Sequence, residues 1–474
     1  MNPWTIFWSL SLIGMLLVMA RLIKSRLHIF TAWFIPSSII AGLIALLASP
    51  YVAGGLLAPW LDPDHRFVDG LIPENVRTVW GVIPGLLINV VFAALFLGKT
   101  LPGPRKIWMQ AGPQVVFGQT LAWGQYVVGI GLCVAFLTPV FGLNPLAGAL
   151  IEIGFEGGHG TAAGMAEVFR SLDFPDGADL ALGLATVGLV AGVALGTVLI
   201  NWAVRKGHIN PARRPDASTT DGTLDADAMV EFQRQQVEEN RPTDPLSIHL
   251  GIVAIAVGVG WVIRAVFQWT EALFWDGDIF GKVPLFPLAM IGGVLIQVFL
   301  DRTGNGHHID RRLMNRISGT ALDFTIVAAL GTLRLDVIGA HLIPFLLLAL
   351  AGIAWNTWGL LWLAPRVIPS GWFERGIGDY GQSMGVTVTG LLLMRVADPA
   401  NESGALDSFG YKQLLFEPIV GGGLFTAASV PLLARFGSVP MLVMTGLITV
   451  GWIVAGFLVF GRGIRASQSA LKTM

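Results

Sequence analysis

The sequence predicts an all-α polytopic membrane protein. We expect two inverted-topology repeats of five transmembrane helices, each with a re-entrant hairpin, followed by one extra C-terminal transmembrane helix. Hydrophobic residues make up 54% of the 474 residues and charged residues only 13%, whereas soluble domains carry roughly 25% charged residues. Apolar runs of membrane-spanning length recur along the chain, and two Gly-rich segments occupy corresponding places in its halves. The net charge of -1 argues against a general affinity for nucleic acid, whose binding rests on clustered Lys and Arg.

Eleven apolar runs are long enough to cross the hydrocarbon core, which takes about 20 residues of helix. They lie at 4–20, 29–49, 79–98, 114–138, 178–204, 247–270, 284–300, 317–333, 337–364, 411–434 and 438–461. Basic residues gather in alternate connections such as "RLIKSR" and "RKGHINPARR", and the positive-inside rule places these in the cytoplasm. We therefore expect the N-terminus outside and the C-terminus in the cytoplasm.

These runs divide the chain into four parts. The parts are a first repeat at 1–204, a cytoplasmic linker at 205–246, a second repeat at 247–434, and the extra helix with a cytoplasmic tail at 435–474. The linker is polar and has no run of spanning length, which favours a tether between the halves.

Two segments, about 146–171 and 373–396, are too Gly-rich and polar for ordinary spans. We interpret both as re-entrant hairpins, because irregular backbone at membrane depth must be covered by protein or line a water-filled cavity. Their glycines repeat at the same spacing of three and then four residues, at 157, 160 and 164 and at 378, 381 and 385. Matched hairpins in two halves are typical of secondary transporters.

Close helix packing is the alternative explanation for a Gly-rich membrane segment. We expect such packing at Gly188, Gly192 and Gly196, where small residues at intervals of four form a ridge. The pairing of two matched motifs favours a binding role for the hairpins.

Broken helices direct N–H groups and free carbonyls at one point, where N–H groups suit a substrate carboxylate and oxygens suit sodium. The candidate substrate-binding residues are Gly157, Gly158, His159, Gly160, Thr161, Gly378, Gly381, Ser383, Thr387 and Thr389.

Ionisable residues within membrane spans are also site candidates. Asp323 lies in a predicted span, and Asn89 falls within one residue of its counterpart in the first repeat. The pair could coordinate a cation, or Asp323 could be hydrated at the end of its helix. Glu152 and Glu156 flank the first hairpin tip, and Glu417 precedes Pro418; each could bind a cation or exchange a proton.

Other chemistries lack their motifs. The sequence has no P-loop, no Ser or Cys in a nucleophile elbow, and no zinc-helix spacing at His307 and His308. We therefore expect neither an enzyme nor an organic cofactor.

At "EGGHGTAAGM" the sequence resembles the bacterial glutamate:sodium symporter family, whose first hairpin carries a Ser-Gly-Gly-His-Gly-Thr type of motif. The strings "GDYGQSMGVTVTG" and "EPIVGGG" are similar to that family's second hairpin and following span. The resemblance implies Na+-coupled uptake of a dicarboxylic amino acid, a homodimer in the bacterial inner (cytoplasmic) membrane, and elevator-type movement of a domain containing both hairpins.

The chain departs from the family pattern at several positions. Glu156 replaces a hydroxyl residue, Asp379 a His-like position and Ser383 a glycine, while Thr426 and Ser429 stand where Asp and Asn are expected. Unit charges 4 Å apart interact by about 4 kcal/mol at an effective dielectric of 20, so extra carboxylates would repel an anion unless cations neutralise them. The sodium candidates are Asp323, Asn89, Thr426 and Glu156.

The sequence thus predicts a sodium-coupled secondary transporter that imports glutamate or a related carboxylate and works in contact with membrane lipid. One alternative is a proton-coupled or exchange transporter of another organic anion. A channel or a membrane-embedded structural protein is the alternative from a different class.

Overall fold

The computed structural model describes residues 2–27, 30, 35–62, 65, 67–99, 103–209, 244–274, 279–399 and 401–461. These residues form helices joined by short connections, and no strand occurs among them. Most of the predicted linker and the tail after 461 lie outside the described residues. The all-helical class predicted from the sequence is confirmed.

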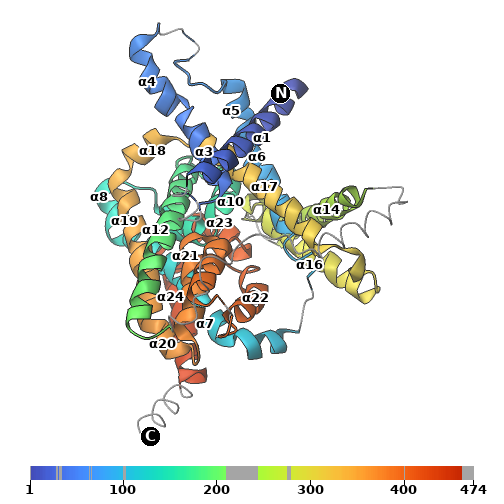
Figure 1. Ribbon diagram of the computed structural model, residues 1–474, viewed down its shortest axis with the longest axis vertical. Coiled ribbons are helices and arrows are strands. Elements are labelled where there is room, and N and C mark those ends of the chain that lie inside the picture. The colour runs from blue at the N-terminus through green and yellow to red at the C-terminus, as the bar shows by residue number, and fades with distance from the viewer. Residues whose placement is uncertain are drawn as a thin grey trace, which may run out of the picture.

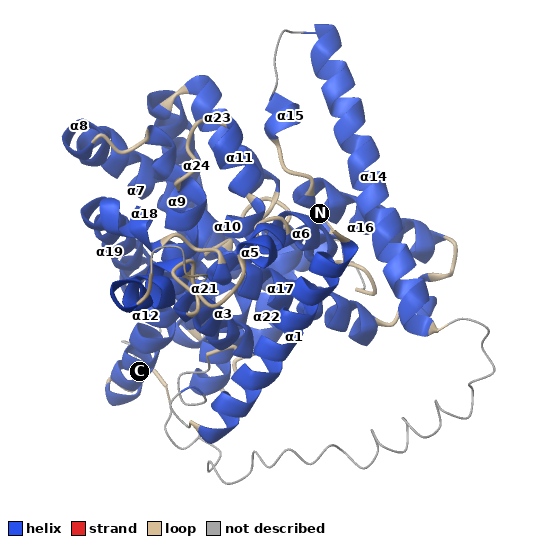
Figure 2. Cartoon of the chain, turned by 90° about the horizontal axis from the view of Figure 1, so that it is seen from above, coloured by secondary structure: helices blue, strands red, loops and turns tan. Residues whose placement is uncertain are grey.

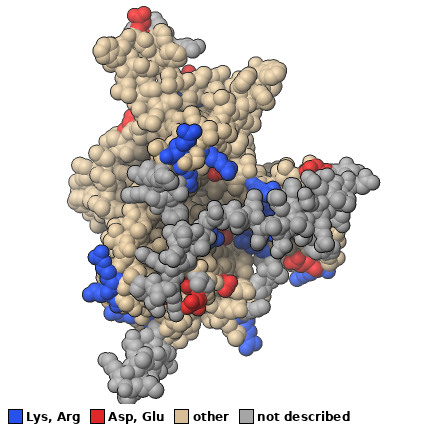
Figure 3. All heavy atoms as spheres, viewed as in Figure 1, with Lys and Arg blue, Asp and Glu red and all other residues tan. Residues whose placement is uncertain are grey.

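Within the described ranges, eight helical stretches are long and apolar enough to cross a membrane. They are Pro3–Arg26, Ser37–Trp60, Glu74–Ala93, Ile107–Phe141, Gly177–Arg205, Pro245–Phe274, Leu342–Val367 and Ser438–Val459. The surface in Figure 3 is mostly uncharged, with acidic and basic side chains in small separate groups. Large apolar side chains such as Trp8, Trp261 and Leu447 are exposed, as expected for helices that face lipid.

Three of the eleven predicted runs do not form a continuous apolar helix of that length. Helix α16 (Phe286–Arg302) has only 17 residues. Helix α17 (Arg311–Gly331) begins with the basic sequence "RRLMNR", which lowers its hydropathy. The run at 411–434 is divided between α22 (Ala405–Phe416) and α23 (Leu424–Phe436).

The helices pack as two groups, which Figure 1 shows side by side. The flanking group contains α1 (Pro3–Arg26), α3 (Ser37–Leu47), α5 (Glu74–Trp80), α6 (Ile83–Ala93), α14 (Pro245–Phe274), α16 and α17. The core group contains α7 (Pro104–Leu132), α9 (Leu150–Phe155), α10 (Gly158–Gly164), α12 (Gly177–Arg205), α19 (Leu342–Trp358), α21 (Trp372–Ala397), α22, α23 and α24 (Ser438–Val459). The shorter helices are α4 (Gly55–Leu57), α8 (Thr138–Phe141), α11 (Ala166–Ser171), α15 (Ile279–Lys282), α18 (Leu335–Ala340) and α20 (Ala364–Val367).

Each group has its own apolar core. In the flanking group, Ile13, Ile40 and Trp80 pack with the end of α17, and the Trp80 Nε1 donates a hydrogen bond of 3.0 Å to the Ser9 carbonyl. The largest cluster surrounds α7, α9, α12 and α21 in the core group. The groups meet where α10 packs on α6 and α17 and where α15 and α16 contact α23, and Figure 2 shows α14 on the far side of α16 from the core group.

Two long helices are interrupted by a π-helical turn just before a proline. The turns are Cys133–Leu137, after α7, and Gly359–Leu363, after α19. Pro139 and Pro365 follow within two residues. Because proline cannot donate to the preceding turn and its ring clashes with it, the backbone widens there. The same device therefore occurs once in each half of the chain.

The glycine ridge of α12 packs against α21. A Cβ at Gly188 would lie 2.2 Å from the Met384 carbonyl oxygen, and one at Gly192 would lie 2.8 Å from the Met384 Cβ. A Cβ at Gly196 would meet Leu393. The close packing predicted for this ridge is confirmed, and it holds α12 directly beside the interruption of α21.

Helix α21 is two arms that fold back on each other. Its backbone leaves the helical region at Gly385 and Val386. A Cβ at Gly381 would lie 2.8 Å from the Gly390 Cα, and one at Gly390 would lie 2.3 Å from the Gly378 carbonyl oxygen. Residues so far apart in one straight helix could not touch, so Gly378 and Gly381 serve the contact between the arms.

Candidate functional site

Three helix interruptions converge between the two groups. The first break lies between α9 and α10, where Gly158 has a φ of +69°. The second break is at Gly385 and Val386 of α21, and the third is the segment between α22 and α23. A Cβ at Gly158 would lie 2.2 Å from the Val386 Cγ1, so the first two breaks touch.

The third break completes this convergence. Gly421 and Gly422 have φ values of +72° and +95°, which side chains rarely permit. The Gly421 N–H donates to the Glu152 Oε1 at 2.9 Å, and a Cβ at Gly422 would lie 2.7 Å from the Thr161 Oγ1. The glycines of "EPIVGGG" thus let the backbone lie directly against the first break.

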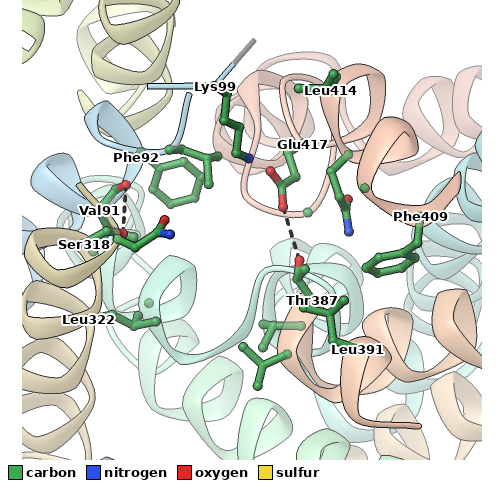
Figure 4. A pocket seen from close by; sticks show the side chains of 18 of the residues that line it. Val91, Phe92, Lys99, Ser318, Leu322, Thr387, Leu391, Phe409, Leu414 and Glu417 are labelled. Atoms are coloured by element: carbon green, nitrogen blue, oxygen red, sulfur yellow. Dashed lines mark hydrogen bonds between the residues drawn. The ribbon is translucent and has the colours of Figure 1, made fainter. Parts of the chain in front are cut away.

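A cavity of about 1280 Å³ opens beside the breaks. Its wall on the flanking group includes Phe92 of α6 and Leu322 of α17, and its wall on the core group includes Thr387, Leu391 and Phe409, as Figure 4 shows. The polar and charged lining residues are Lys99, Glu156, His159, Thr161, Arg311, Asn315, Ser318, Thr387, Asp407, Tyr411, Gln413 and Glu417.

One end of the cavity holds opposite charges. The Thr387 hydroxyl donates to the Glu417 Oε1 at 3.2 Å, and the Lys99 ammonium points toward the same carboxylate in Figure 4. Burial lowers the pKa of the Lys99 ammonium from its ordinary value, and Glu417 acts in the opposite direction. Arg311 also lines the cavity, but its Nη1 donates to the carbonyls of Ala94 and Leu97 and so closes the end of α6.

The side chain of Glu156 also lines this cavity. It is only 2% exposed, and neither of its oxygens has a hydrogen-bond partner of good geometry among the described residues. The hydroxyls of Thr161 and Ser383 are likewise buried without partners, and the Ser383 hydroxyl faces Glu156. Buried polar atoms are normally satisfied, so this set of oxygens indicates a place for a ligand.

Glu152 contrasts with Glu156, although both lie on the first Gly-rich segment. Its Oε2 accepts from the Tyr126 hydroxyl at 2.5 Å, and its Oε1 accepts from the Thr426 hydroxyl at 2.7 Å as well as from the Gly421 N–H. Thr426 therefore holds Glu152 and the third break together.

The second break leaves backbone carbonyls that would be bonded in an intact helix. The Ser383 carbonyl accepts from the Gln125 Nε2 and from the Asn356 Nδ2, both at 2.7 Å. The Gly385 carbonyl accepts from the Thr389 hydroxyl at 2.5 Å. Side chains from α7 and α19 thus fix the position of the break.

The structure brings about half of the predicted substrate residues to the cavity. Gly157, His159, Gly160, Thr161 and Thr387 line it. The others lie behind it: Gly158 forms the contact between breaks, Gly378 and Gly381 pack the arms of α21, and Ser383 and Thr389 are buried beside the second break. His159 bonds to the Thr186 hydroxyl at 3.0 Å.

The predicted sodium candidates are not all in one place. Glu156 lines the cavity and Thr426 lies just behind it. Asp323 and Asn89 are outside the cavity lining, and the Asn89 Nδ2 donates to the Gly85 and Leu86 carbonyls of its own helix. Among the described residues, no group of three or more His, Cys, Asp and Glu could hold a metal ion. Hydroxyl and carboxylate oxygens around Glu156 suit a hard monovalent cation better than a transition metal.

The sequence analysis did not identify the buried polar residues of α7, α19 and α22. They include Gln114, Gln125, Asn356, Lys412 and Gln413. Each is a polar or charged side chain within or beside an apolar run, which is the signal that drew attention to Asp323. Lys412 forms an ion pair with Asp379, with 2.9 Å between Nζ and Oδ1, and both side chains are fully buried.

Comparison with known proteins identifies the family of this chain. No curated protein matches the chain. The sodium/glutamate symporter family matches residues 105–355, which include α7, the first break, α12 and α17. The match covers more than half of the sequence, and the chain therefore belongs to the sodium/glutamate symporter family, whose members are membrane transporters and not enzymes.

Proposed function

We propose that this chain is a secondary active transporter that uses the sodium gradient to import glutamate or a related carboxylate. Family membership supports the reaction class and sodium as the coupling ion. The observation that carries the proposal for this chain is the set of buried oxygens at Glu156, Thr161 and Ser383 that have no hydrogen-bond partner of good geometry among the described residues, beside a cavity between two groups of helices.

Sodium binding is assigned to these oxygens. Sodium prefers oxygen ligands, and broken helices supply free backbone carbonyls beside the side-chain hydroxyls. A bound cation would neutralise Glu156, which otherwise opposes the entry of an anion. Thr426 and Glu152 would support this place from behind through their mutual hydrogen bond. Asp323 and Asn89 stay predictions for a separate cation site.

The carboxylate substrate is assigned to the cavity itself. The Lys99 ammonium and the Arg311 guanidinium, whose Nη1 already donates to backbone carbonyls, are lining groups that attract an anion. Thr387 and His159 add side chains that can form hydrogen bonds. Because Lys99 already faces Glu417, a carboxylate that binds Lys99 competes with an internal partner.

For the mechanism we propose elevator movement of the core group against the flanking group. The contact surface on α10 is formed by small residues: a Cβ at Gly160 would meet the tips of Ile88 and Leu322, and one at Gly164 would meet Ile88 and Phe286. A helix face formed by small residues can slide along its neighbouring helices. The substrate cavity lies on this same boundary, so movement would change which side of the membrane it faces.

The repeat architecture is part of the same proposal. The folded-back arms of α21, the break after α9, and the two π-helical turns before Pro139 and Pro365 support two inverted repeats with re-entrant hairpins. The glycine alignment needs adjustment, because the first break lies at Gly158, directly after the first of its three glycines, and the second break lies at the last, Gly385. The homodimer, the inner-membrane location and the orientation of the termini stay predictions.

Uptake by the purified protein in liposomes tests this function. With potassium buffer inside, labelled glutamate should accumulate only when sodium is present outside at higher concentration. Equal uptake with choline in place of sodium would exclude sodium coupling. Competition by unlabelled carboxylates and amino acids then defines the substrate class.

A second candidate, a proton-coupled or exchange transporter of another organic anion, is favoured by the same unpartnered carboxylate of Glu156. The variant Glu156→Gln separates the two candidates. If transport is coupled to sodium, uptake by Glu156→Gln should depend less on the sodium concentration and keep its pH profile. If transport is coupled to protons, the pH profile of uptake by Glu156→Gln should become flatter, and sodium should have no effect.

A further inference from the structure

A second set of buried charges lies in the core group, next to the part of the cavity wall that Phe409 and Gln413 form. The Lys412 ammonium on α22 is 2.9 Å from the Asp379 Oδ1 and donates to the Gln382 Oε1 at 2.8 Å. The Gln413 Nε2 donates to the same Gln382 oxygen at 2.8 Å, while the Gln382 Nε2 donates to the Gln413 Oε1 at 3.2 Å. This reciprocal pair fixes the amide of Gln382 with its oxygen toward the ammonium.

The surroundings of this ammonium are shaped for a cation. The Phe416 ring centroid lies 3.7 Å from the Lys412 Nζ, and the Phe409 ring centroid lies at 5.2 Å. Aromatic faces at these distances attract a cation. On the remaining side stands Gly118 of α7, where a Cβ would be 2.6 Å from the Lys412 Cε and 2.7 Å from its Nζ. The absence of a side chain at Gly118 therefore creates the space that the ammonium fills.

The ion pair also sets the charge of the core group. Glu152, Glu156 and Asp379 are all buried there. A buried carboxylate without compensation is strongly unfavourable, and Lys412 compensates Asp379 directly. A covalently attached ammonium cannot leave during a transport cycle, in contrast to a bound ion.

We propose that Asp379, Gln382, Phe409 and Phe416 form a monovalent-cation site that the chain occupies with its own Lys412 ammonium. The site uses none of the oxygens of Glu156, Thr161 and Ser383, although the Lys412 charge also acts on Glu156. It requires no assumption about the substrate or about sodium coupling. Removal of the side chain should convert it into a site for a free small ammonium ion.

The test is thermal unfolding of the purified full chain in sodium-free buffer. Lys412→Ala removes the ammonium and opens its space. We expect the unfolding midpoint of this variant to fall by roughly 5 °C in choline chloride, and methylammonium chloride at equal ionic strength to restore at least half of that loss. The midpoint of the unchanged chain should be the same in both salts. Equal midpoints for Lys412→Ala in choline and in methylammonium would overturn the proposal.

Lys412→Met is the matched control, because it fills a similar volume without charge. We expect it to be destabilised and not restored by methylammonium; restoration would show that the salt acts elsewhere. If Lys412→Ala does not fold, the unfolding midpoint of the double variant Asp379→Asn with Lys412→Met tests the proposal instead. The cation site predicts a higher midpoint for the double variant than for Lys412→Met, and an equal or lower midpoint contradicts it. Neither result bears on sodium-coupled uptake, which is measured separately.

Discussion

The first and second breaks differ in how their buried acidic residues are satisfied. At the first break Glu156 faces the cavity, and its two oxygens have no partner of good geometry in the described structure. Beside the second break Asp379 is turned away from the cavity and is paired with Lys412. A carboxylate that is left open can respond to a dissolved ion, whereas one that is closed by an internal ammonium cannot. The comparison assigns ligand exchange to the first break and charge balance to the second.

The same chemical change at both positions tests this contrast and should have the largest effect. Asp379→Asn leaves the Lys412 ammonium buried without its counter-ion, and loss of one partner of a buried pair costs about 3 kcal/mol. Glu156→Gln removes a charge that forms no ion pair within the described residues, although the Lys412 charge also acts on it, and should cause no comparable loss. Chemical or thermal unfolding in detergent measures both.

The comparison fails if Glu156→Gln is the more destabilised of the two. Wild-type stability for Asp379→Asn would also contradict it, because the ammonium would then have another partner. Sodium dependence of uptake by each variant that folds gives the second readout, and we expect it to change for Glu156→Gln.

The contact between the breaks provides the next test. Gly158→Ala places a side chain at a φ of +69°, which costs roughly 1–2 kcal/mol. It also adds a Cβ at 2.2 Å from the Val386 Cγ1. We expect uptake to fall by about tenfold or more, because both breaks must shift and 1.4 kcal/mol corresponds to a factor of ten.

Gly160→Ala is the control for this variant. Its Cβ would meet only the ends of the Ile88 and Leu322 side chains, which can move. If Gly160→Ala reduced uptake more than Gly158→Ala at equal protein levels, the contact between α10 and the flanking group would be the more sensitive place.

The sequence analysis identified the carboxylate at the first break but not the ion pair beside the second break. The membrane class follows from composition and run length, because hydropathy acts directly on the whole span. Glu156 was recognisable because a carboxylate beside clustered glycines is unusual inside a membrane. Lys412 was not recognised, since no periodicity links it to Asp379 and only the fold brings α22 against α21.

The position of the second break also depended on tertiary contacts. Equal glycine spacing in the two halves suggested equivalent tips, yet α21 remains helical through Gly378 and Gly381 and breaks at Gly385. The amides of Gln125 and Asn356, from two other helices, hold the Ser383 carbonyl beside that break. Such partners cannot be read from glycine spacing within one segment.

Thr387 lies at the second break and contributes a hydrogen bond to the charged end of the cavity. A variant at this position should show the smallest effect. Thr387→Val keeps the shape but removes the donor to the Glu417 Oε1. It also removes the cavity hydroxyl that is proposed to form a hydrogen bond with the substrate. Such a bond contributes about 1 kcal/mol, so the apparent affinity for glutamate should weaken by about fivefold. The sodium dependence should change little, because Thr387 is not among the oxygens assigned to sodium. A loss of sodium dependence in Thr387→Val would place Thr387 in ion binding as well and would contradict that assignment.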